Sequence, residues 1–155
     1  MNTTLPTFLD ALQAALAARG GLAGVNVFSC PVDPEDMGKE AIELAKEVTI
    51  DQVRESMAST VLSETYEVTG AVLVHRTSKQ GTGSINNAAK AARDRAHAIL
   101  EELVDEISTN DTMTGTVRDV TITTHRWAQG MSPENRLGRF ARVEFTLTVG
   151  ASVTP

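Results

Sequence analysis

Alternating apolar and polar residues mark three stretches of the chain as strands with one buried face. They are residues 65–75, 120–124 and 141–149. Because side chains along a strand point to opposite faces in turn, this period of two predicts half-buried strands. The last two stretches follow one another, so we expect them to pair as a hairpin. Their connection, residues 127–138, is longer than an ordinary hairpin loop, and long loops in compact domains are often functional.

Apolar residues spaced three or four positions apart predict two helices. The first begins after Thr4, a candidate N-cap, carries Pro6 in its first turn and ends at Gly20 and Gly21. The second covers residues 84–108 and follows a glycine-rich connection. Its apolar stripe consists mostly of alanines in the first half and of larger side chains in the second half. The first half can therefore approach another backbone closely.

The segment between the first helix and the first long strand is only partly defined by its pattern. Residues 25–28 are apolar and predict a short strand, and the prolines and carboxylates of residues 31–36 predict an acidic loop. Residues 41–45 fit a strand or a helical turn equally well, and residues 48–57 show no clean period. The structure of residues 39–62 stays open at this point.

The order of these elements predicts the fold class. Helix, strand, uncertain segment, strand, long helix, strand and strand indicate an α+β protein: a mixed, largely antiparallel β-sheet with helices packed on one face. With 155 residues, of which 41% are hydrophobic, the chain is expected to form a single domain over residues 1–155.

The composition argues against several function classes. Fourteen Lys and Arg against twenty Asp and Glu give a formal net charge of -6, which disfavours sequence-specific nucleic-acid binding. The longest apolar stretch, residues 9–18, is interrupted by Asp10 and Gln13 and is too short to cross a membrane. Cys30 is the only cysteine and cannot form an internal disulfide.

The residues that usually carry chemistry do not form a recognisable site. The three histidines, His75, His97 and His125, lack the spacing of metal ligands, and Cys30 has no neighbouring cation to stabilise a thiolate. No GxSxG nucleophile motif is present. We therefore expect no enzyme activity and no catalytic, cofactor or metal site.

One alternative is a small-ligand or anion-binding module. Gly81, Gly83 and Ser84 lie between a predicted strand and a predicted helix, where backbone amides can hold a phosphate group. Neither the P-loop pattern nor the dinucleotide-binding GxGxxG pattern is complete here. A plain strand-to-helix connection explains these residues more simply.

The long helix has an unusual distribution of charge. Its first half carries Lys90, Arg93 and Arg95, and its second half carries Glu101, Glu102, Asp105 and Glu106. The helix dipole favours the opposite order. One hypothesis is that neighbouring copies meet basic end against acidic end, with Glu101 and Asp105 in the contact. The alternative is that intrachain partners such as Arg118 or Lys79 neutralise these charges.

The predicted long loop offers a second candidate contact. Trp127, Met131 and Leu137 are apolar residues on this segment, and Arg136 and Arg139 are placed to flank them. We expect the three apolar side chains to be exposed in a free subunit and buried on assembly. The alternative is that Trp127 simply packs on the edge of the sheet.

The layout resembles the tail terminator, or tail completion, proteins of long-tailed siphophages, especially those that infect actinobacteria. The stretches that carry the resemblance are GLAGVNVFSCPVDP (21–34), ETYEVTGAVLV (64–74), AAKAARDRAHAILEELVDEI (88–107), GTVRDVTI (115–122) and GRFARVEFTLTVGA (138–151). Together with the first helix and the glycine-rich connection they cover most of the chain outside residues 35–63. No stretch is a catalytic signature.

The resemblance implies a structural virion protein without a cofactor. It implies a mixed-sheet fold that forms a homohexameric ring, caps the tail tube, ends tube elongation and joins the tail to the head connector. The partners would be other copies of the chain, the tail tube protein and a head connector or neck protein. The ring would be assembled in the host cytoplasm and located in the virion, at the head-tail junction, where DNA passes through its lumen. Another head-to-tail connector or neck protein is the nearest alternative.

Overall fold

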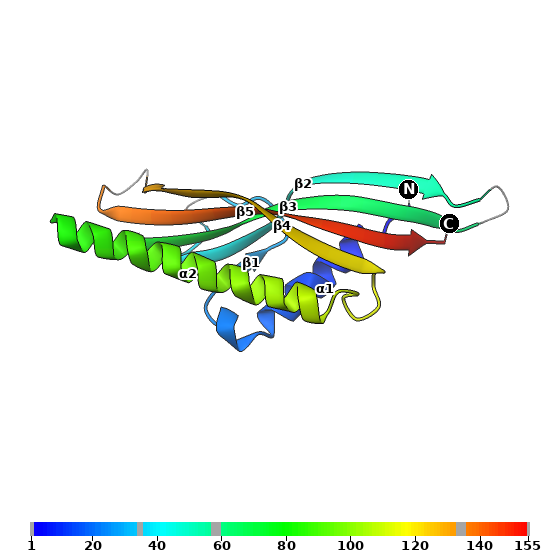
Figure 1. Ribbon diagram of the computed structural model, residues 1–155, viewed down its shortest axis with the longest axis horizontal. Helices are drawn as coiled ribbons and strands as arrows, with labels where there is room; N and C mark the ends of the chain where they lie inside the picture. Colours follow the sequence, from blue (N-terminus) through cyan, green and yellow to red (C-terminus); the bar gives the residue numbers. More distant parts are fainter. Residues whose placement is uncertain (1, 34–35, 57–59, 133–135, 155) are drawn as a thin grey trace.

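The computed structural model describes residues 2–33, 36–56, 60–132 and 136–154 (Figure 1). Its helices are α1 (Leu5–Ala17), the short 3₁₀ helix η1 (Gly20–Leu22) and α2 (Thr82–Thr109). Its strands are β1 (Asn26–Phe28), β2 (Glu40–Arg54), β3 (Leu62–Thr77), β4 (Asp119–Met131) and β5 (Gly138–Val153). The order of these elements is the predicted one.

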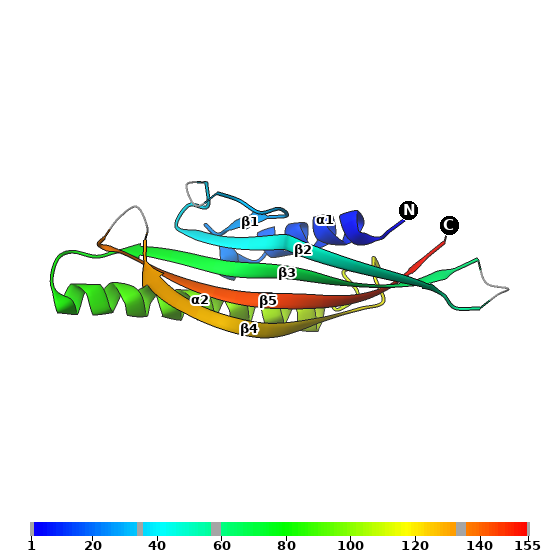
Figure 2. The same cartoon turned by 90° about the horizontal axis from the view of Figure 1, so that it is seen from above.

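The five strands form one sheet in the order β1-β2-β3-β5-β4. β1 runs parallel to β2, and the other neighbouring pairs are antiparallel. Both helices lie on the same face of the sheet, and the molecule is elongated along the strands (Figures 1 and 2). The predicted α+β class, with a largely antiparallel sheet and helices on one face, is confirmed.

The hydrophobic core lies between the two helices and this face of the sheet. α1 contributes Phe8, Leu12 and Leu16, and the large residues in the second half of α2 include Ile99 and Leu103. The predicted buried faces of the two central strands are confirmed. They consist of Tyr66, Val68, Val72 and Val74 on β3 and Ala141, Val143, Phe145, Leu147 and Val149 on β5.

The N-terminus of α1 is stabilised by a residue far away in the sequence. The helix begins after Thr4 as predicted, but the Thr4 side chain does not cap it. Instead the Thr4 backbone N–H and hydroxyl both donate to Oε2 of Glu64 on β3, at 2.9 and 2.8 Å. Glu64 is fully buried and also accepts a hydrogen bond from Gln52. Since α1 has no acidic residue in its first turn, Glu64 supplies the negative charge that the helix dipole favours.

The hydrogen bonds keep this buried carboxyl ionised. Burial by itself would raise the pKa of Glu64, because it penalises the charged form. The hydrogen bonds from Thr3, Thr4 and Gln52 outweigh that effect, and the pKa of Glu64 is lowered. Burial raises the pKa of the neighbouring Tyr66 hydroxyl to about 12, and the charge of Glu64 adds to the shift. Tyr66 is therefore neutral beside an ionised Glu64.

The open segment, residues 39–62, contains the long strand β2. The pairing of β2 with β3 is irregular between Glu43 and Glu47, opposite Gly70, and Ala45 there has a positive φ of 53°. Residues 44–46 of β2 therefore lie opposite Gly70 alone, so the strand bulges there. The two extra residues keep the same side-chain alternation before and after the bulge, because Ile42 and Val48 both face the core. Residues 41–44 are buried on both faces, and the core-facing positions after the bulge are only partly buried and include Gln52, so the sequence of β2 shows no clean alternation of apolar and polar residues.

The hairpin β4–β5 differs from the prediction. The predicted strand 120–124 continues to Met131, so the connection is residues 132–137 and not 127–138. A second irregularity, between Thr124 and Arg126, shifts the alternation by one residue. Ile122 pairs with Leu147 before this point, and Trp127 pairs with Val143 after it, so both point to the helix side. Because the shift broke the period in the sequence, the second half of β4 was mistaken for a loop.

Gly70 and Phe145 form a register pair at the centre of the sheet, between the two irregularities. A Cβ atom at Gly70 would lie 2.5 Å from the Glu43 carbonyl oxygen and 2.6 Å from Cζ of Phe145. Both distances are far below van der Waals contact. The position therefore requires glycine so that the Phe145 ring can lie across the strand.

We expect Gly70→Ala to lower the free energy of unfolding by about 1–3 kcal/mol, because the added methyl group must displace backbone or an aromatic ring. Urea denaturation measures this change. Gly83→Ala is the matched control, since a Cβ at Gly83 meets nothing within 4 Å, and should be neutral or stabilising by up to about 1 kcal/mol. Equal effects of the two substitutions would contradict the close packing at Gly70.

We expect Glu64→Gln to lower the free energy of unfolding at pH 7 by about 1–3 kcal/mol, because the amide replaces an acceptor oxygen that faces two donors on Thr4. The lowered pKa of Glu64 means that its stabilisation is present above the unfolded-state pKa and is lost as the pH falls through the folded-state pKa. The difference between the two proteins should therefore shrink at about pH 3.

Urea denaturation at both pH values tests this pH dependence. Glu67→Gln, an exposed position on the same strand, should change stability by less than about 0.5 kcal/mol. A Glu64→Gln effect of the same size at both pH values would argue against an ionised Glu64.

Candidate assembly surface

Each side of the sheet has an open strand edge. β1 pairs with only three residues of β2, Ala41, Ile42 and Glu43. In the strand order, residues 47–54 of β2 therefore have β3 as their one neighbour, and on the opposite side β4 has only β5. Open edges present backbone N–H and C=O groups that another strand can pair with. The described part of the molecule thus has two such edges, on opposite sides.

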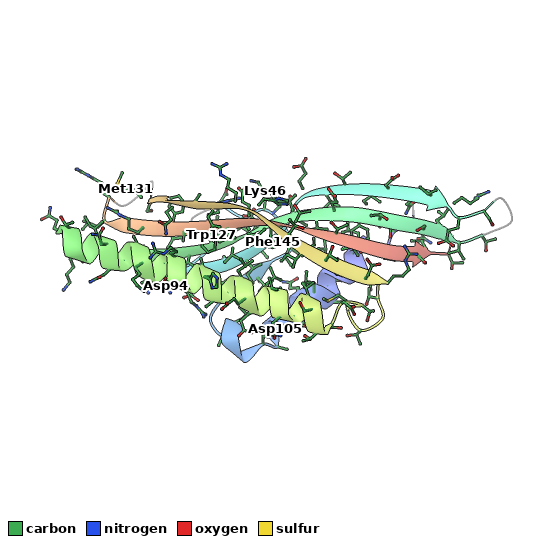
Figure 3. All side chains as sticks on the ribbon, viewed as in Figure 1. Lys46, Asp94, Asp105, Trp127, Met131 and Phe145 are labelled. Atoms are coloured by element: carbon green, nitrogen blue, oxygen red, sulfur yellow. The ribbon has the colours of Figure 1, made fainter. Side chains whose placement is uncertain are left out.

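The exposed large hydrophobic residues lie at these two edges. Among the described residues they are Val53 (59% exposed), Val104 (36%), Trp127 (42%) and Met131 (61%). Val53 belongs to the open part of β2. Trp127 and Met131 lie on β4, and Val104 lies on α2, which packs beneath that side of the sheet (Figure 3). We call residues 47–54 the β2 edge and the surface around Val104, Trp127 and Met131 the β4–α2 flank.

Trp127 links β4 to α2. Its indole stacks on the His97 ring, with centroids 6.2 Å apart and an interplanar angle of 22°. His97 Nδ1 lies 3.5 Å from Oε1 of Glu101. The prediction that Trp127 lies on a long loop was wrong, and the alternative, that it packs on the sheet edge, describes its position. Its exposed fraction nevertheless leaves part of the ring free for another contact.

A groove continues this flank along α2. It has a volume of about 520 Å³ and is lined by His97, Leu100, Glu101, Val104, Asp105 and Ser108. Leu100 and Val104 are apolar, and Glu101 and Asp105 are acidic. The flank therefore combines an apolar surface with carboxylates.

Most charges of α2 have partners within the chain. Arg19 donates to Glu102 at 2.6 Å, to Glu106 at 2.9 Å and to Asp105 at 2.5 Å. The hydrogen bonds to Glu106, Glu102 and Asp105 raise the pKa of Arg19 far above its ordinary value. The guanidinium therefore remains charged and holds the end of α1 against α2.

These partners are not the ones that the sequence suggested. Arg95 pairs with Glu40 at 3.0 Å, and the nearest carboxylate recorded for Arg118 is Glu55, at 3.9 Å. The proposed intrachain neutralisation thus takes place through other residues than Arg118 and Lys79. Glu101, whose side chain is 69% exposed, is the acidic residue of the groove most open to a second molecule.

The other candidate residues lie at the tip of the β4–β5 hairpin. The Leu137 carbonyl accepts hydrogen bonds from the backbone and hydroxyl of Ser78, at 3.0 and 2.5 Å. Arg139 donates to the carbonyl oxygens of Arg136 and Gly138, both at 2.8 Å. Arg139 therefore organises the turn, and Leu137 is partly buried, while Arg136 is exposed. The structure does not bring this group together with Glu101 and Asp105.

The glycine-rich connection is organised by its own backbone. Gly81 has a positive φ of 115°, a conformation that favours glycine. The Ser84 hydroxyl accepts a hydrogen bond from the Lys79 backbone N–H at 2.9 Å. The geometry of the turn therefore explains why glycine and serine occur in this connection.

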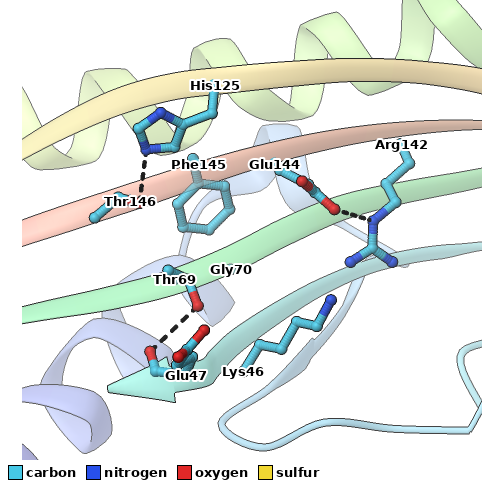
Figure 4. Close-up of a pocket in the computed structure, with 9 residues that line it drawn as sticks. All are labelled: Lys46, Glu47, Thr69, Gly70, His125, Arg142, Glu144, Phe145 and Thr146. Carbon is cyan, nitrogen blue, oxygen red and sulfur yellow. Dashed lines mark hydrogen bonds and ion pairs between the residues drawn. The ribbon is translucent and has the colours of Figure 1, made fainter. Parts of the chain in front are cut away.

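The sequence did not reveal a depression on the helix-free face of the sheet (Figure 4). It has a volume of about 170 Å³ and is lined by Lys46, Glu47, Thr69, Gly70, His125, Arg142, Glu144, Phe145 and Thr146. His125 contacts the Thr146 hydroxyl at 2.7 Å, and Arg142 pairs with Glu144 at 3.1 Å. Its residues come from four strands and meet at the two irregularities, so no sequence motif could indicate them. Acids and bases are mixed here without an arrangement typical of catalysis.

Within the described ranges the chain has neither a metal-binding group of side chains nor a membrane-spanning α-helix. No group of three or more His, Cys, Asp and Glu side chains there is placed to hold a metal ion. No α-helix in the same ranges is long and apolar enough to span a bilayer.

The described residues define an α+β protein with an open five-stranded sheet, helices on one face and, within that part of the chain, two unpaired strand edges. No protein-family model and no curated protein matches the chain. Among solved structures, it is similar to a chain of the virion of a native gene transfer agent particle. The identity is 13% and the TM-score 0.47, over 92% of this chain and 94% of the other.

We expect Arg19→Met to lower the free energy of unfolding by about 1–2 kcal/mol, because it leaves three carboxylates of α2 close together without their cation. High salt screens that repulsion, so the loss should be smaller in 1 M NaCl. Urea denaturation at low and high salt measures both effects. Arg93→Met, at an exposed position of α2, is the control and should have little effect. A salt-independent loss would mean that Arg19 acts through packing alone.

Proposed function

We propose that the chain is a structural virion protein that assembles head to tail into a closed ring, a homohexamer. The ring caps the tail tube, ends its elongation and offers the surface that joins the tail to the head connector. The protein performs no enzymatic reaction in this role, and it needs no cofactor. It is located in the virion, at the top of the tail.

The observation that carries this proposal is the position of the exposed apolar side chains. The β2 edge and the β4–α2 flank lie on opposite sides of the subunit. Among the described residues, the β2 edge carries one exposed large hydrophobic side chain, Val53, and the flank carries three. A contact between two different surfaces is heterologous, and its repetition closes a ring when the rotation between copies permits. A two-fold dimer would instead use one surface twice. The distribution therefore favours a ring.

The strand directions are compatible with this contact. β2 and β5 run in the same direction, and β4 runs in the opposite one. If copies are related by rotation about an axis along the strands, β4 of one copy approaches β2 of the next in antiparallel orientation. The backbone groups of the two open edges can then form hydrogen bonds between copies.

The remaining parts of the proposal come from the resemblance to tail terminator proteins. The similar stretches include most of β3, α2 and β5, which together form the centre of the subunit. The number of six subunits and the tail tube and head connector as partners are expectations of that resemblance. The same ring bound to a connector but not to a tube would indicate a neck protein instead.

We expect wild-type protein to form a discrete species of about six subunits, either alone or on tail tubes. Met131→Lys and Val53→Lys should each shift the species to monomer, because each places a charge in the apolar contact. Light scattering coupled to size exclusion, over a range of concentrations, measures the mass. Thr65→Lys is the control, since Thr65 is exposed on the central strand β3, away from both edges. A wild-type monomer that is indifferent to tubes would contradict the proposal.

Trp127 reports on the same contact by fluorescence. It is the only tryptophan of the chain, and 42% of it is exposed in the subunit. Burial in the ring should shift its emission maximum to shorter wavelength. His97→Ala serves to separate the effect of the stacked imidazole from that of assembly. An emission maximum that is the same in free and assembled protein would exclude Trp127 from the contact.

A further inference from the structure

The charge separation of α2 extends to the whole subunit. The start of α2, the end of β3, the end of β4 and the start of β5 lie at one end of the molecule. The end of β2 and the start of β3 lie at the other, and α2 ends between the two (Figures 1 and 2). We call the first the basic end, the described residues of 75–95 and 126–142. The acidic end is our name for the described residues of 47–67 and 101–119, which extend from the middle of the molecule towards the opposite end. The two ends are separated along the long axis of the molecule.

Cations predominate at the basic end. They are Arg76, Lys79, Lys90, Arg93, Arg95, Arg126, Arg136, Arg139 and Arg142. The same segments contain only two acidic residues in the sequence, Asp94 and Glu134, and Glu134 lies outside the described residues. Lys79, Lys90, Arg93, Arg126 and Arg136 are exposed. The surplus of positive charge at this end is therefore accessible from solvent.

Carboxylates predominate at the acidic end. They are Glu47, Asp51, Glu55, Glu64, Glu67, Glu101, Glu102, Asp105, Glu106, Asp111 and Asp119. The cations of these segments are Arg54 and Arg118. Arg19 compensates part of the charge on α2, but Asp51, Glu67 and Asp111 are exposed. Positive and negative charges are thus separated along the length of the subunit.

The basic end already shows how it binds a carboxylate. Glu40, at the start of β2, accepts hydrogen bonds from Arg76 at 2.5 Å and from Arg95 at 3.0 Å. Burial would raise the pKa of Glu40, but these two arginines outweigh it and lower the pKa. Lys90 likewise pairs with Asp94. The planar donor groups of arginine match carboxylates well.

We propose that the basic end is a docking surface for another protein with a carboxylate-rich surface. The contacts of Glu40 with Arg76 and Arg95 show that a carboxylate suits these cations, so an acidic protein is the expected partner and nucleic acid is the competing ligand in the test below. An acidic protein surface that approaches along the axis meets the cations first and is repelled from the opposite end. Charge polarity of this kind sets the orientation of docking as well as its rate.

This inference goes beyond the proposed ring and does not depend on it. A single subunit presents the same cations, since they are placed by its own β3–α2 connection and β4–β5 hairpin. In a ring, all copies would present the basic end on one rim, and repeated weak contacts would add up through avidity. The ring would then have one basic and one acidic rim.

The test measures binding of a fluorescein-labelled peptide of twelve glutamates to the full chain by anisotropy. We expect binding in 20 mM NaCl that weakens steeply by 300 mM. Lys79→Glu/Lys90→Glu should weaken it roughly tenfold or more, because it reverses two exposed charges at the basic end. Arg54→Glu/Arg118→Glu is the matched control, with the same change in net charge at the acidic end. It should weaken binding by less than about twofold.

Three outcomes would overturn the proposal. The first is that the peptide does not bind the wild-type protein at low salt. The second is that both double variants lose the same amount of peptide affinity. The third is that a DNA duplex with the same number of charges binds more tightly than the peptide and uses the same lysines. Light scattering on the same samples keeps the two proposals apart. A ring that does not bind the peptide refutes only the docking surface. A protein that binds the peptide but stays monomeric even when tail tubes are added refutes only the ring.

Discussion

The pairing of β3 with β5 is the constraint on which the rest of the structure depends. The two strands pair along their whole length, from Leu62 with Val153 to Thr77 with Gly138. One face of this pair carries the core side chains and the other carries mostly polar ones. A shift by one residue would exchange the two faces, so burial fixes the register. Both helices, β2 and β4 are positioned against this central pair.

The close packing of Phe145 over Gly70 affects both sides of the sheet. The neighbouring strands are irregular at the same level, β2 between Glu43 and Glu47 and β4 between Thr124 and Arg126. On β4 the irregularity shifts the alternation of side chains and turns Trp127 towards α2. The apolar part of the β4–α2 flank therefore depends on the irregularity of β4, which lies at the level of Phe145. A feature of the core thereby determines a surface that we propose for assembly.

Electrostatic interactions act at two levels in this molecule. Within the subunit, Arg19 joins α1 to α2, Glu64 joins α1 to β3, and Glu40 joins β2 to α2 through Arg95. These contacts connect elements that are distant in the sequence. Between the two ends, the surplus charges have opposite signs and are exposed, which makes them suited to contacts with other molecules.

The sequence by itself determined the fold class, the two helices, the faces of β3 and β5 and the order of elements, because each depends on a local period of side chains. It could not predict β2, because residues 41–44 are buried on both faces and show no alternation, or the second half of β4, because irregular pairing there shifts the period by one residue. Only the tertiary structure decided three further contacts. They are the stacking of Trp127 on His97, the hydrogen bonds of Glu64 with Thr4 and the ion pairs of Arg19. Each joins residues far apart in the chain, and no local pattern records which distant segment will supply the partner.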